Sequence, residues 1–151
     1  MKIGFGCDHT AINLKKELME YMTEKGYECV DYGAYDASVR VDYPDQGQKV
    51  AEAIIAGEVE KGVLICGTGI GVSIAANKVP GAYAALVSDV YSAQRARLSN
   101  DANIMCMGAF TTGNKERELF VDAFLTNEFV PGCASQPKVD AFHKYDEEHS
   151  K

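Results

Sequence analysis

The sequence has no long apolar run, no closely spaced pair of cysteines and no excess of basic residues. A membrane-spanning helix needs about 18 consecutive apolar residues, and no stretch of the 151 residues approaches that length. The apolar start of the chain ends at Asp8-His9, which is too early for a secretory signal peptide. The net charge of −7 argues against nucleic acid and anionic membrane surfaces as partners.

The five cysteines, at positions 7, 29, 66, 106 and 133, are scattered and odd in number. Because no Cys-x-x-Cys pair occurs, the spacing supports neither a disulfide framework nor a zinc site. Reduced thiols are typical of cytosolic proteins, so we expect a cytoplasmic protein. A chain of this length is expected to form one domain, residues 1–151, with a sizeable core.

Short β-prone runs alternate with amphipathic stretches along the whole chain. The predicted strands cover residues 2–7, 27–32, 63–66, 82–87 and 104–107. The predicted helices cover residues 11–22, 46–56, 72–77, 90–98 and 115–125, with a last helix in the tail from Ser135. In the helix over 115–125, we expect Leu119, Phe120 and Ala123 to face inward. We expect the acidic stretch from Asp146 onward to be a solvated end.

Five strands that alternate with helices predict an open parallel sheet with helices on both faces. In such sheets, ligands bind beyond the carboxyl ends of the strands. Three groups of residues follow predicted strands directly: Cys7-Asp8-His9, the loop after Cys66, and Ser88-Asp89. These three groups are therefore the candidates for a functional site.

The loop Gly67-Thr68-Gly69-Ile70-Gly71 lies between a predicted strand and a predicted helix. Backbone N–H groups in that position bind phosphate or stabilise a developing oxyanion, and glycines let the backbone approach a ligand closely. A tight turn without a ligand is one alternative. A dinucleotide site is another, with Asp89 as the acidic residue, although its fingerprint needs glycine or alanine where the chain has Val72. The P-loop pattern is absent because no Gly-Lys-Ser/Thr follows.

Cys66 comes immediately before this loop. Amides around a thiol favour the thiolate, which can act as a nucleophile or as a general base. Cys29 and Cys106 lack such a loop, and we interpret them as packing residues. Asp8 and His9 can transfer protons or hold sugar hydroxyls, and Asp8 is also predicted to cap the helix that begins near Thr10. A metal site built from Asp8, His9, Asp42 and Asp45 is a further alternative, although its spacing matches no known ligand pattern.

Four stretches resemble a known family over essentially the whole chain: GCDH near the N-terminus, DYPD after the second strand, ICGTGIGVSIAANKVPG in the middle and YSAQRARLSNDANI after the fourth strand. They resemble the type B ribose-5-phosphate isomerases and the related galactose-6-phosphate isomerase subunits. The resemblance implies a Rossmann-like three-layer α/β/α sandwich with a five-stranded parallel sheet, assembled as a homodimer or homotetramer. It also implies aldose–ketose isomerisation of a small sugar phosphate through an enediolate, without metal or cofactor.

The resemblance further implies a role for particular residues. Cys66 would be the base that takes the C2 proton, Thr68 would assist at the sugar oxygens, and the loop amides would hold the enediolate oxygen. Asn100 would reach in from a neighbouring subunit. The residues that would contact the substrate are Asp8, His9, Tyr43, Gly67, Gly69, Ile70, Gly71, Ser99, Asn100 and Lys138.

Two departures from the resemblance concern the substrate. The ribose-phosphate enzymes carry a ring-opening histidine before the asparagine, and this chain has Ser99. They carry arginines for the phosphate after the fifth strand and near the C-terminus, where this chain has Phe110 and only Lys138. Either the chain acts on another sugar or sugar phosphate, with His9 or Lys138 taking over part of the work, or it is the cysteine-bearing subunit of a hetero-oligomer whose partner chain supplies the missing groups. A non-catalytic small-molecule binding domain is the alternative outside enzymes.

Overall fold

The computed structural model describes residues 1–150. The strands are β1 (Lys2–Cys7), β2 (Glu28–Asp31), β3 (Lys61–Cys66), β4 (Ala84–Leu86) and β5 (Ile104–Gly108). The helices are α1 (Ile12–Glu24), α2 (Tyr43–Ile55), α3 (Ile70–Ala76), α4 (Val90–Leu98), α5 (Asn114–Leu125) and α6 (Gln136–His149). The strands pair in parallel in the order β2-β1-β3-β5-β4.

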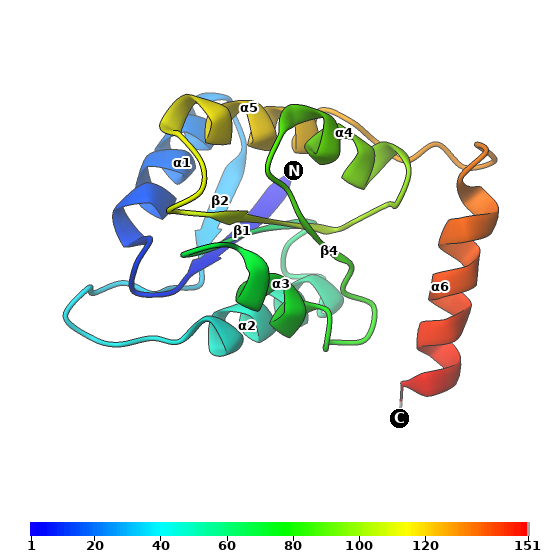
Figure 1. Cartoon of the computed structure of the whole chain (residues 1–151), viewed down its shortest axis with the longest axis horizontal. Helices are drawn as coiled ribbons and strands as arrows, with labels where there is room; N and C mark the ends of the chain where they lie inside the picture. The colour runs from blue at the N-terminus through cyan, green and yellow to red at the C-terminus, as the bar shows by residue number, and fades with distance from the viewer. Residues whose placement is uncertain (151) are drawn as a thin grey trace.

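Two layers of helices enclose this sheet, as Figure 1 shows. Helices α1, α4 and α5 cover one face, and α2 and α3 cover the other. The predicted three-layer α/β/α architecture with a five-stranded parallel sheet is therefore confirmed. Among residues 1–150, no helix has the length and apolar character that crossing a membrane would require.

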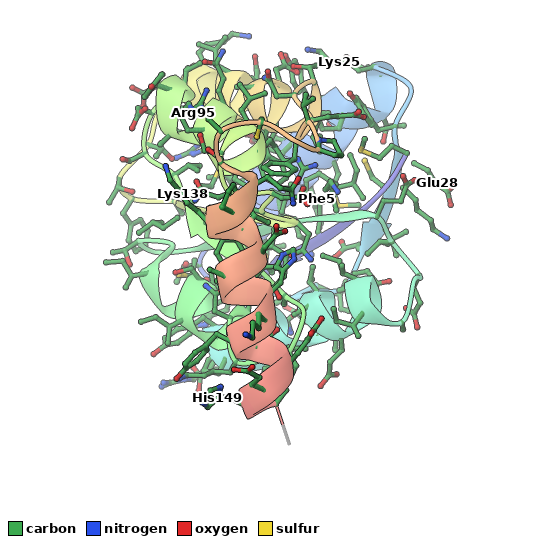
Figure 2. The ribbon with its side chains drawn as sticks, turned by 90° about the vertical axis from the view of Figure 1, so that its right-hand side faces the viewer. Phe5, Lys25, Glu28, Arg95, Lys138 and His149 are labelled. Carbon is green, nitrogen blue, oxygen red and sulfur yellow. The ribbon has the colours of Figure 1, made fainter. Side chains whose placement is uncertain are left out.

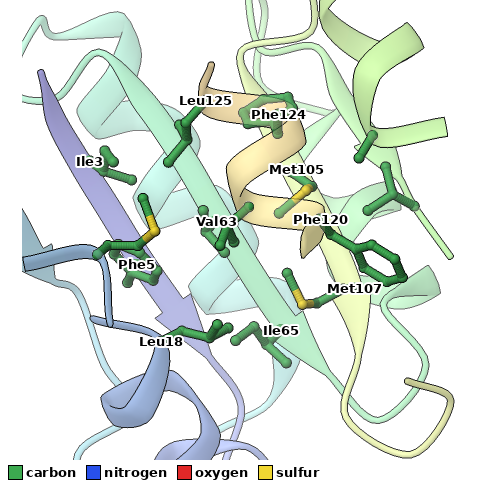
Figure 3. Packing of buried hydrophobic residues seen from close by; sticks show 14 of the residues in the cluster. Ile3, Phe5, Leu18, Val63, Ile65, Met105, Met107, Phe120, Phe124 and Leu125 are labelled. Atoms are coloured by element: carbon green, nitrogen blue, oxygen red, sulfur yellow. The ribbon is translucent and has the colours of Figure 1, made fainter. Parts of the chain in front are cut away.

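Strand β3 supplies side chains to both cores, because successive residues of a strand point to opposite faces of the sheet. Val63 and Ile65 belong to the larger core beneath α1, α4 and α5, which Figure 3 shows from close by. Leu64 and Cys66 belong to the smaller core beneath α2 and α3. The thiol of Cys66 thus lies on the α2/α3 side of the sheet.

Most element boundaries agree with the sequence predictions, and the differences have local causes. Helix α2 begins at Tyr43, three residues before the predicted start, because Pro44 and Asp45 suit the first turn of a helix. Strand β4 covers only three residues. The prediction that Leu119 faces inward is wrong, since its side chain is 53% exposed, whereas Phe120 and Ala123 are buried.

Helix α6 stands apart from the two helical layers, at one side of the molecule in Figure 1 and facing the viewer in Figure 2. Val139 is its one buried residue. The helix docks on the segment before β4, where Asp146 accepts hydrogen bonds from the Gly81 N–H at 2.6 Å and the Tyr83 hydroxyl at 3.0 Å. The expectation of a solvated end from Asp146 is therefore wrong for that residue, which lies inside α6.

Candidate active site

The carboxyl ends of β1, β3 and β5 meet at one edge of the sheet, and backbone hydrogen bonds join the loops that follow them. The Asp8 N–H donates to the Ile65 carbonyl at 3.3 Å. The Ala109 N–H donates to the Cys66 carbonyl at 2.8 Å, and the Phe110 N–H donates to the Gly67 carbonyl at 2.9 Å. The structure thus brings together the first two predicted groups, Asp8-His9 and the glycine loop.

Cys66 ends β3 with its side chain only 3% exposed. The Gly69 N–H donates to the Cys66 Sγ at 3.2 Å, so the glycine loop turns one of its amides back onto the sulfur. Gly69 has a φ of +77°, the left-handed conformation that this turn requires and that glycine adopts without strain. Because α3 has only seven residues, individual amides of the loop matter more here than a helix dipole.

Thr68 is the exposed polar residue of this loop, next to the exposed side chain of Ile70. Its Oγ1 accepts a hydrogen bond from the Ile70 N–H at 3.3 Å. The hydroxyl proton therefore remains available for a ligand, because a hydroxyl that accepts through one lone pair can still donate.

Three apolar or aromatic side chains pack against the glycines of the loop. A Cβ atom on Gly69 would lie 2.6 Å from Leu86 Cδ1 and 2.7 Å from the Met107 carbonyl carbon. A Cβ on Gly71 would lie 2.5 Å from the Tyr43 ring, and one on Gly67 would lie 3.0 Å from the Phe110 ring. The glycines are thus required by packing against protein atoms, in addition to any close approach of a ligand.

Asp8 does not cap a helix, contrary to the prediction. Its Oδ1 accepts from the Thr10 N–H at 2.9 Å and from the Thr10 hydroxyl at 2.5 Å, which is a local turn of the kind that aspartate favours. Helix α1 begins later, at Ile12, after the uncapped residue Ala11. With 7% exposure, Asp8 is a buried element of the loop after β1.

His9 is held by a single backbone carbonyl. Both its N–H and its ring Nδ1 lie within hydrogen-bond distance of the Val41 oxygen, at 3.3 Å and 3.1 Å. Because a carbonyl only accepts, Nδ1 is the ring nitrogen that donates to it in this pair. His9 lines a hollow of about 390 Å³ together with residues that include Phe110 and Arg117.

Ser99, Asn100 and Lys138 lie elsewhere in the same chain. Helix α4 runs back along the sheet, and the chain after it passes the amino end of β3, where the Gly62 N–H donates to the Asn103 carbonyl. Ser99 and Asn100, just before Asn103, therefore lie at the end of β3 opposite to Cys66. The Ser99 hydroxyl accepts from the Arg95 guanidinium. Lys138 is exposed on α6, as Figure 2 shows. Within one chain, these three residues therefore do not join the loop after Cys66.

Asn100 borders a different depression of the surface. This hollow of about 310 Å³ lies along the edge strand β4 and is lined by residues that include Tyr83 and Phe142 of α6. It is separate from the hollow lined by His9, because the two share no lining residue.

The proposed metal ligands do not form a cluster. Asp42 pairs with Arg40 at 3.0 Å, and both side chains are largely exposed. Among residues 1–150, no three or more His, Cys, Asp or Glu side chains come together in a way that could hold a metal ion. The alternative of a metal site from Asp8, His9, Asp42 and Asp45 therefore has no support in the geometry.

All five cysteines are free. Burial raises the pKa of the Cys7 thiol to about 11, and it also raises the pKa of Cys106, which lies next to Cys66 and is fully buried. Cys106 thus stays a thiol within the apolar core, in agreement with the predicted packing role. Cys29 is half-buried, and burial raises its pKa as well.

The sequence analysis missed a buried lysine that organises this edge of the sheet. Lys15 is 0% exposed, and its ammonium donates to the Asp31 carboxylate and to the Ala34 carbonyl. Residues 33 and 34 in turn exchange two backbone hydrogen bonds with Cys7 at the end of β1, each of 2.7 Å. A signal was present, because Lys15 lies at helical spacing between Ala11 and Leu18 in the apolar stripe of α1.

The comparisons with known proteins decide the family. A family model described as Ribose/Galactose Isomerase matches residues 3–142, a range that contains every predicted site residue. The chain belongs to this family. It is therefore a sugar-phosphate isomerase of the aldose–ketose kind and not a non-catalytic binding domain.

Individual relatives cover nearly the whole chain. The chain is 44% identical to Ribose-5-phosphate isomerase B of Escherichia coli, over 93% of both chains. It is 40% identical to D-erythrulose-4-phosphate isomerase of Pectobacterium atrosepticum, over 99% of both. It is 42% identical to galactose-6-phosphate isomerase subunit LacB of Clostridium acetobutylicum, over 90% of this chain and 78% of that one.

A solved structure of Clostridium thermocellum ribose-5-phosphate isomerase B superimposes with a TM-score of 0.93. That protein is 43% identical, and the match covers 99% of both chains. The sheet order and the position of the loop after β3 are thus those of this isomerase fold.

Proposed function

We propose that the chain interconverts an aldose phosphate and a ketose phosphate, in a reaction of the ribose 5-phosphate/ribulose 5-phosphate type, with Cys66 as the base. The observation that carries the proposal is the position of the Cys66 Sγ at the end of β3, 3.2 Å from the Gly69 N. A thiolate and a set of backbone donors on one turn are what an enediolate reaction requires.

The mechanism moves two protons, one from C2 to C1 and one from O2 to O1. The Cys66 thiolate takes the proton from C2 of the open-chain aldose, the C–H electron pair becomes the C1–C2 double bond, and the carbonyl electrons pass to O1. The backbone amides of residues 67–71 stabilise the resulting negative oxygen, while Thr68 assists in proton transfer between O1 and O2. Return of the proton from Cys66 to C1 completes the ketose. A general base contributes about 10²–10⁴-fold to such a step, and each oxyanion donor contributes about 10²–10³-fold.

Asp8, His9 and Tyr43 are the remaining substrate contacts from the same chain. Their placement supports this, because Asp8 and His9 follow β1 beside the loop and the Tyr43 ring packs on Gly71. The relatives are named for ribose 5-phosphate, galactose 6-phosphate and D-erythrulose 4-phosphate. We therefore assign the substrate class as a small sugar phosphate.

We propose that Ser99, Asn100 and Lys138 act across an interface, as part of a homodimer or homotetramer with shared sites. Their distance along the fold from Cys66 supports this, because they can reach a loop of this kind only from another chain. The similarity to subunit LacB supports the alternative of a homologous partner chain. The free cysteines support a reducing, cytoplasmic location.

The test is an isomerase assay of the purified chain alone, across tetrose 4-phosphates, pentose 5-phosphates, hexose 6-phosphates and unphosphorylated sugars. Activity of the chain alone rules out an obligatory partner chain, and silence on every substrate supports one. For the active substrate, Cys66→Ala must abolish turnover. If Cys66→Ala turns over as fast as the unaltered chain, the proposed base is wrong.

A further inference from the structure

We infer, on the basis of the enediolate mechanism proposed above, that Arg117 is a positioning residue of the active site. Its guanidinium holds the loop of residues 109–112 after β5, and this loop orients the peptide groups between Cys66 and Thr68. Arg117 thus acts on the reaction through the backbone of the glycine loop.

Arg117 lies near the start of α5 and is only 6% exposed. Its Nε donates to the Thr112 hydroxyl at 2.8 Å, and its Nη2 donates to the Ala109 carbonyl at 2.7 Å and to the Thr112 carbonyl. Its Nη1 donates to the Asn114 side chain at 2.5 Å. Three of these four bonds therefore hold the loop of residues 109–112, from its first residue to its last.

The acceptors around this guanidinium are neutral: two carbonyls, a hydroxyl and a side-chain amide oxygen. Burial lowers the pKa of Arg117 against the opposing charges of Glu17 and Glu116, and an arginine in a protein nevertheless stays protonated. Burying a charge among neutral groups costs folding free energy. An apolar side chain would fill the same space without that cost, so the distinct contribution of Arg117 is the set of bonds that it makes to the loop.

The same loop is bonded to the backbone on either side of the glycine loop's first turn. The Ala109 N–H donates to the Cys66 carbonyl at 2.8 Å, and the Phe110 N–H donates to the Gly67 carbonyl at 2.9 Å. Ala109 therefore accepts from Arg117 with its carbonyl and donates to Cys66 with its N–H. One residue separates the guanidinium from the residue that carries the base.

The anchored carbonyls determine the direction of the N–H groups that follow them. In a planar trans peptide, the C=O and N–H bonds point in opposite directions. Since the Cys66 and Gly67 carbonyls point toward the loop after β5, the N–H groups of Gly67 and Thr68 point away from it. These N–H groups belong to the set that stabilises the enediolate oxygen in the proposed mechanism, and such donors act only when they are aimed at the developing charge. Gly67 has no Cβ to restrict its own backbone, so the orientation depends on the bonds from residues 109 and 110.

The experiment compares Arg117→Met with Val121→Ala, in the purified full chain and with the sugar phosphate that the chain turns over in the assay above. Methionine fills the buried space but donates no hydrogen bond. Val121 lies one turn further along α5 and is fully buried in the larger core, so its variant controls for a loss of stability in the same helix. We expect Arg117→Met to lower kcat by about 10²-fold with KM little changed. We expect Val121→Ala to lower Tm and to leave the kcat of the folded protein unchanged.

The affinities for two inhibitors provide a readout that a loss of stability does not change. A phosphorylated hydroxamate mimics the planar, anionic enediolate, whereas the corresponding alditol phosphate mimics the substrate. We expect Arg117→Met to weaken binding of the hydroxamate by about the same factor as kcat/KM, because both depend on the oriented donors. Binding of the alditol phosphate should stay unchanged.

Two further variants decide the inference if Arg117→Met does not fold. Arg117→Lys keeps the charge, but an ammonium lacks the planar fork that reaches several acceptors at once, so we expect its kcat to stay well below that of the unaltered chain. Thr112→Val removes the acceptor of Nε and leaves the two carbonyl bonds in place, so we expect a smaller fall in kcat.

The possible outcomes separate this inference from the proposed function. Full turnover by Arg117→Met, or by both further variants where Arg117→Met does not fold, overturns the inference and leaves the role of Cys66 intact. Equal losses of affinity for the two inhibitors, or an equal fall in kcat in Val121→Ala, also overturn it, because Arg117 would then only stabilise the fold. Full activity of Cys66→Ala overturns the enediolate proposal itself, whatever the variants of Arg117 show.

Discussion

At the scale of single residues, Gly69 shows how closely the catalytic loop is built against its surroundings. Its φ of +77° excludes most side chains, and a Cβ would meet both Leu86 and the Met107 backbone. Gly57 has a similar φ of +73°, but a Cβ on this residue would have no neighbouring atom within 4 Å. Alanine at Gly57 therefore measures the free-energy cost of the left-handed backbone alone, and alanine at Gly69 adds the cost of steric overlap with Leu86 and Met107.

We predict that Gly57→Ala lowers the free energy of unfolding by about 1 kcal/mol, the usual cost of a left-handed alanine. Gly69→Ala should cost about 1–3 kcal/mol more, because overpacking adds to the same conformational cost. Urea denaturation of both variants measures the difference. Equal losses at the two positions would show that the contacts of Gly69 do not constrain the loop.

The buried pair of Lys15 and Asp31 leads to an asymmetric prediction. The Lys15 side chain is 0% exposed, whereas that of Asp31 is 25% exposed. Asp31→Ala leaves a buried ammonium without its partner and should cost about 3–5 kcal/mol. Lys15→Met leaves a carboxylate that water can reach, and it should cost clearly less. Free energies of unfolding for the two variants check the order, and the reverse order would contradict it.

The predictability of single residues depended on whether their partners were near in sequence. Cys66 and Gly69 are three residues apart, so the loop pattern alone indicated that an amide would face the thiol. The carbonyl of Val41 that holds His9, and the side chain of Leu86 that packs on Gly69, come from distant segments. No local pattern could have indicated either contact.

At the scale of elements, helix α6 docks through ring contacts of Phe142 and His143 with Tyr83 and through the hydrogen bonds of Asp146. The Gly81 N–H and the Tyr83 hydroxyl donate hydrogen bonds to the Asp146 carboxylate. These bonds, and the one from Gly81 most of all, hold the pKa of this carboxyl below its usual range. Because the pKa of Asp146 is lower in the folded protein than in the unfolded chain, its ionised carboxylate stabilises the fold at pH values above the unfolded pKa of about 4. This stabilisation is lost as the pH falls through the pKa of the folded state. The docking should therefore weaken in acid.

We predict that Asp146→Asn lowers Tm at neutral pH and that this difference from the unaltered chain shrinks as pH falls below about 4. The asparagine keeps a hydrogen-bonding oxygen but has no charge to lose. Thermal melting of both proteins across this pH range provides the measurement. A difference in Tm that is the same at every pH would contradict the role of the ionised carboxylate.

Elements were predictable where the hydrophobic period was clear. The predicted strand over residues 2–7 and helix over 90–98 agree with β1 and α4 at both ends. The start of α2 at Tyr43 was missed because Asp42-Tyr43-Pro44-Asp45 is as typical of a turn as of a first helical turn. The docking of α6 was missed because its partners, Gly81 and Tyr83, lie more than sixty residues earlier in the chain.

At the scale of the whole molecule, the parallel sheet places Cys66 and Asn100 at opposite ends of the fold. We predict that Cys66→Ala and Asn100→Ala are each inactive as separate homo-oligomers. When the two variants are dissociated, mixed and reassembled, half of the dimers contain one chain of each variant. Each mixed dimer has one intact site out of two, so the mixture should recover up to about a quarter of the activity of the unaltered dimer.

The matched control mixes Cys66→Ala with Thr68→Ala, whose altered residues belong to the same loop of one chain. This mixture should recover no activity, because every mixed dimer then has one altered residue in each site. Recovery in both mixtures, or in neither, would contradict a site shared between the loop of one chain and Asn100 of another.

The architecture as a whole was predictable because alternating strands and helices allow few topologies. The strand order and the composition of the two cores were beyond the sequence, since both depend on contacts between distant elements. The fold places one thiol, Cys66, at the end of a central strand beside a glycine loop whose Gly69 amide donates to the sulfur.

The most direct test of this account compares Cys66→Ala with Cys106→Ala. In both variants, kcat is measured together with the exchange of solvent deuterium into the sugar at C1 and C2. Cys106 is the adjacent, fully buried thiol, so its variant controls for the loss of a sulfur from the same core. The account predicts a fall in kcat of about 10²–10⁴-fold and loss of deuterium exchange for Cys66→Ala alone, with Tm little changed. Deuterium exchange and turnover that survive in Cys66→Ala would contradict it.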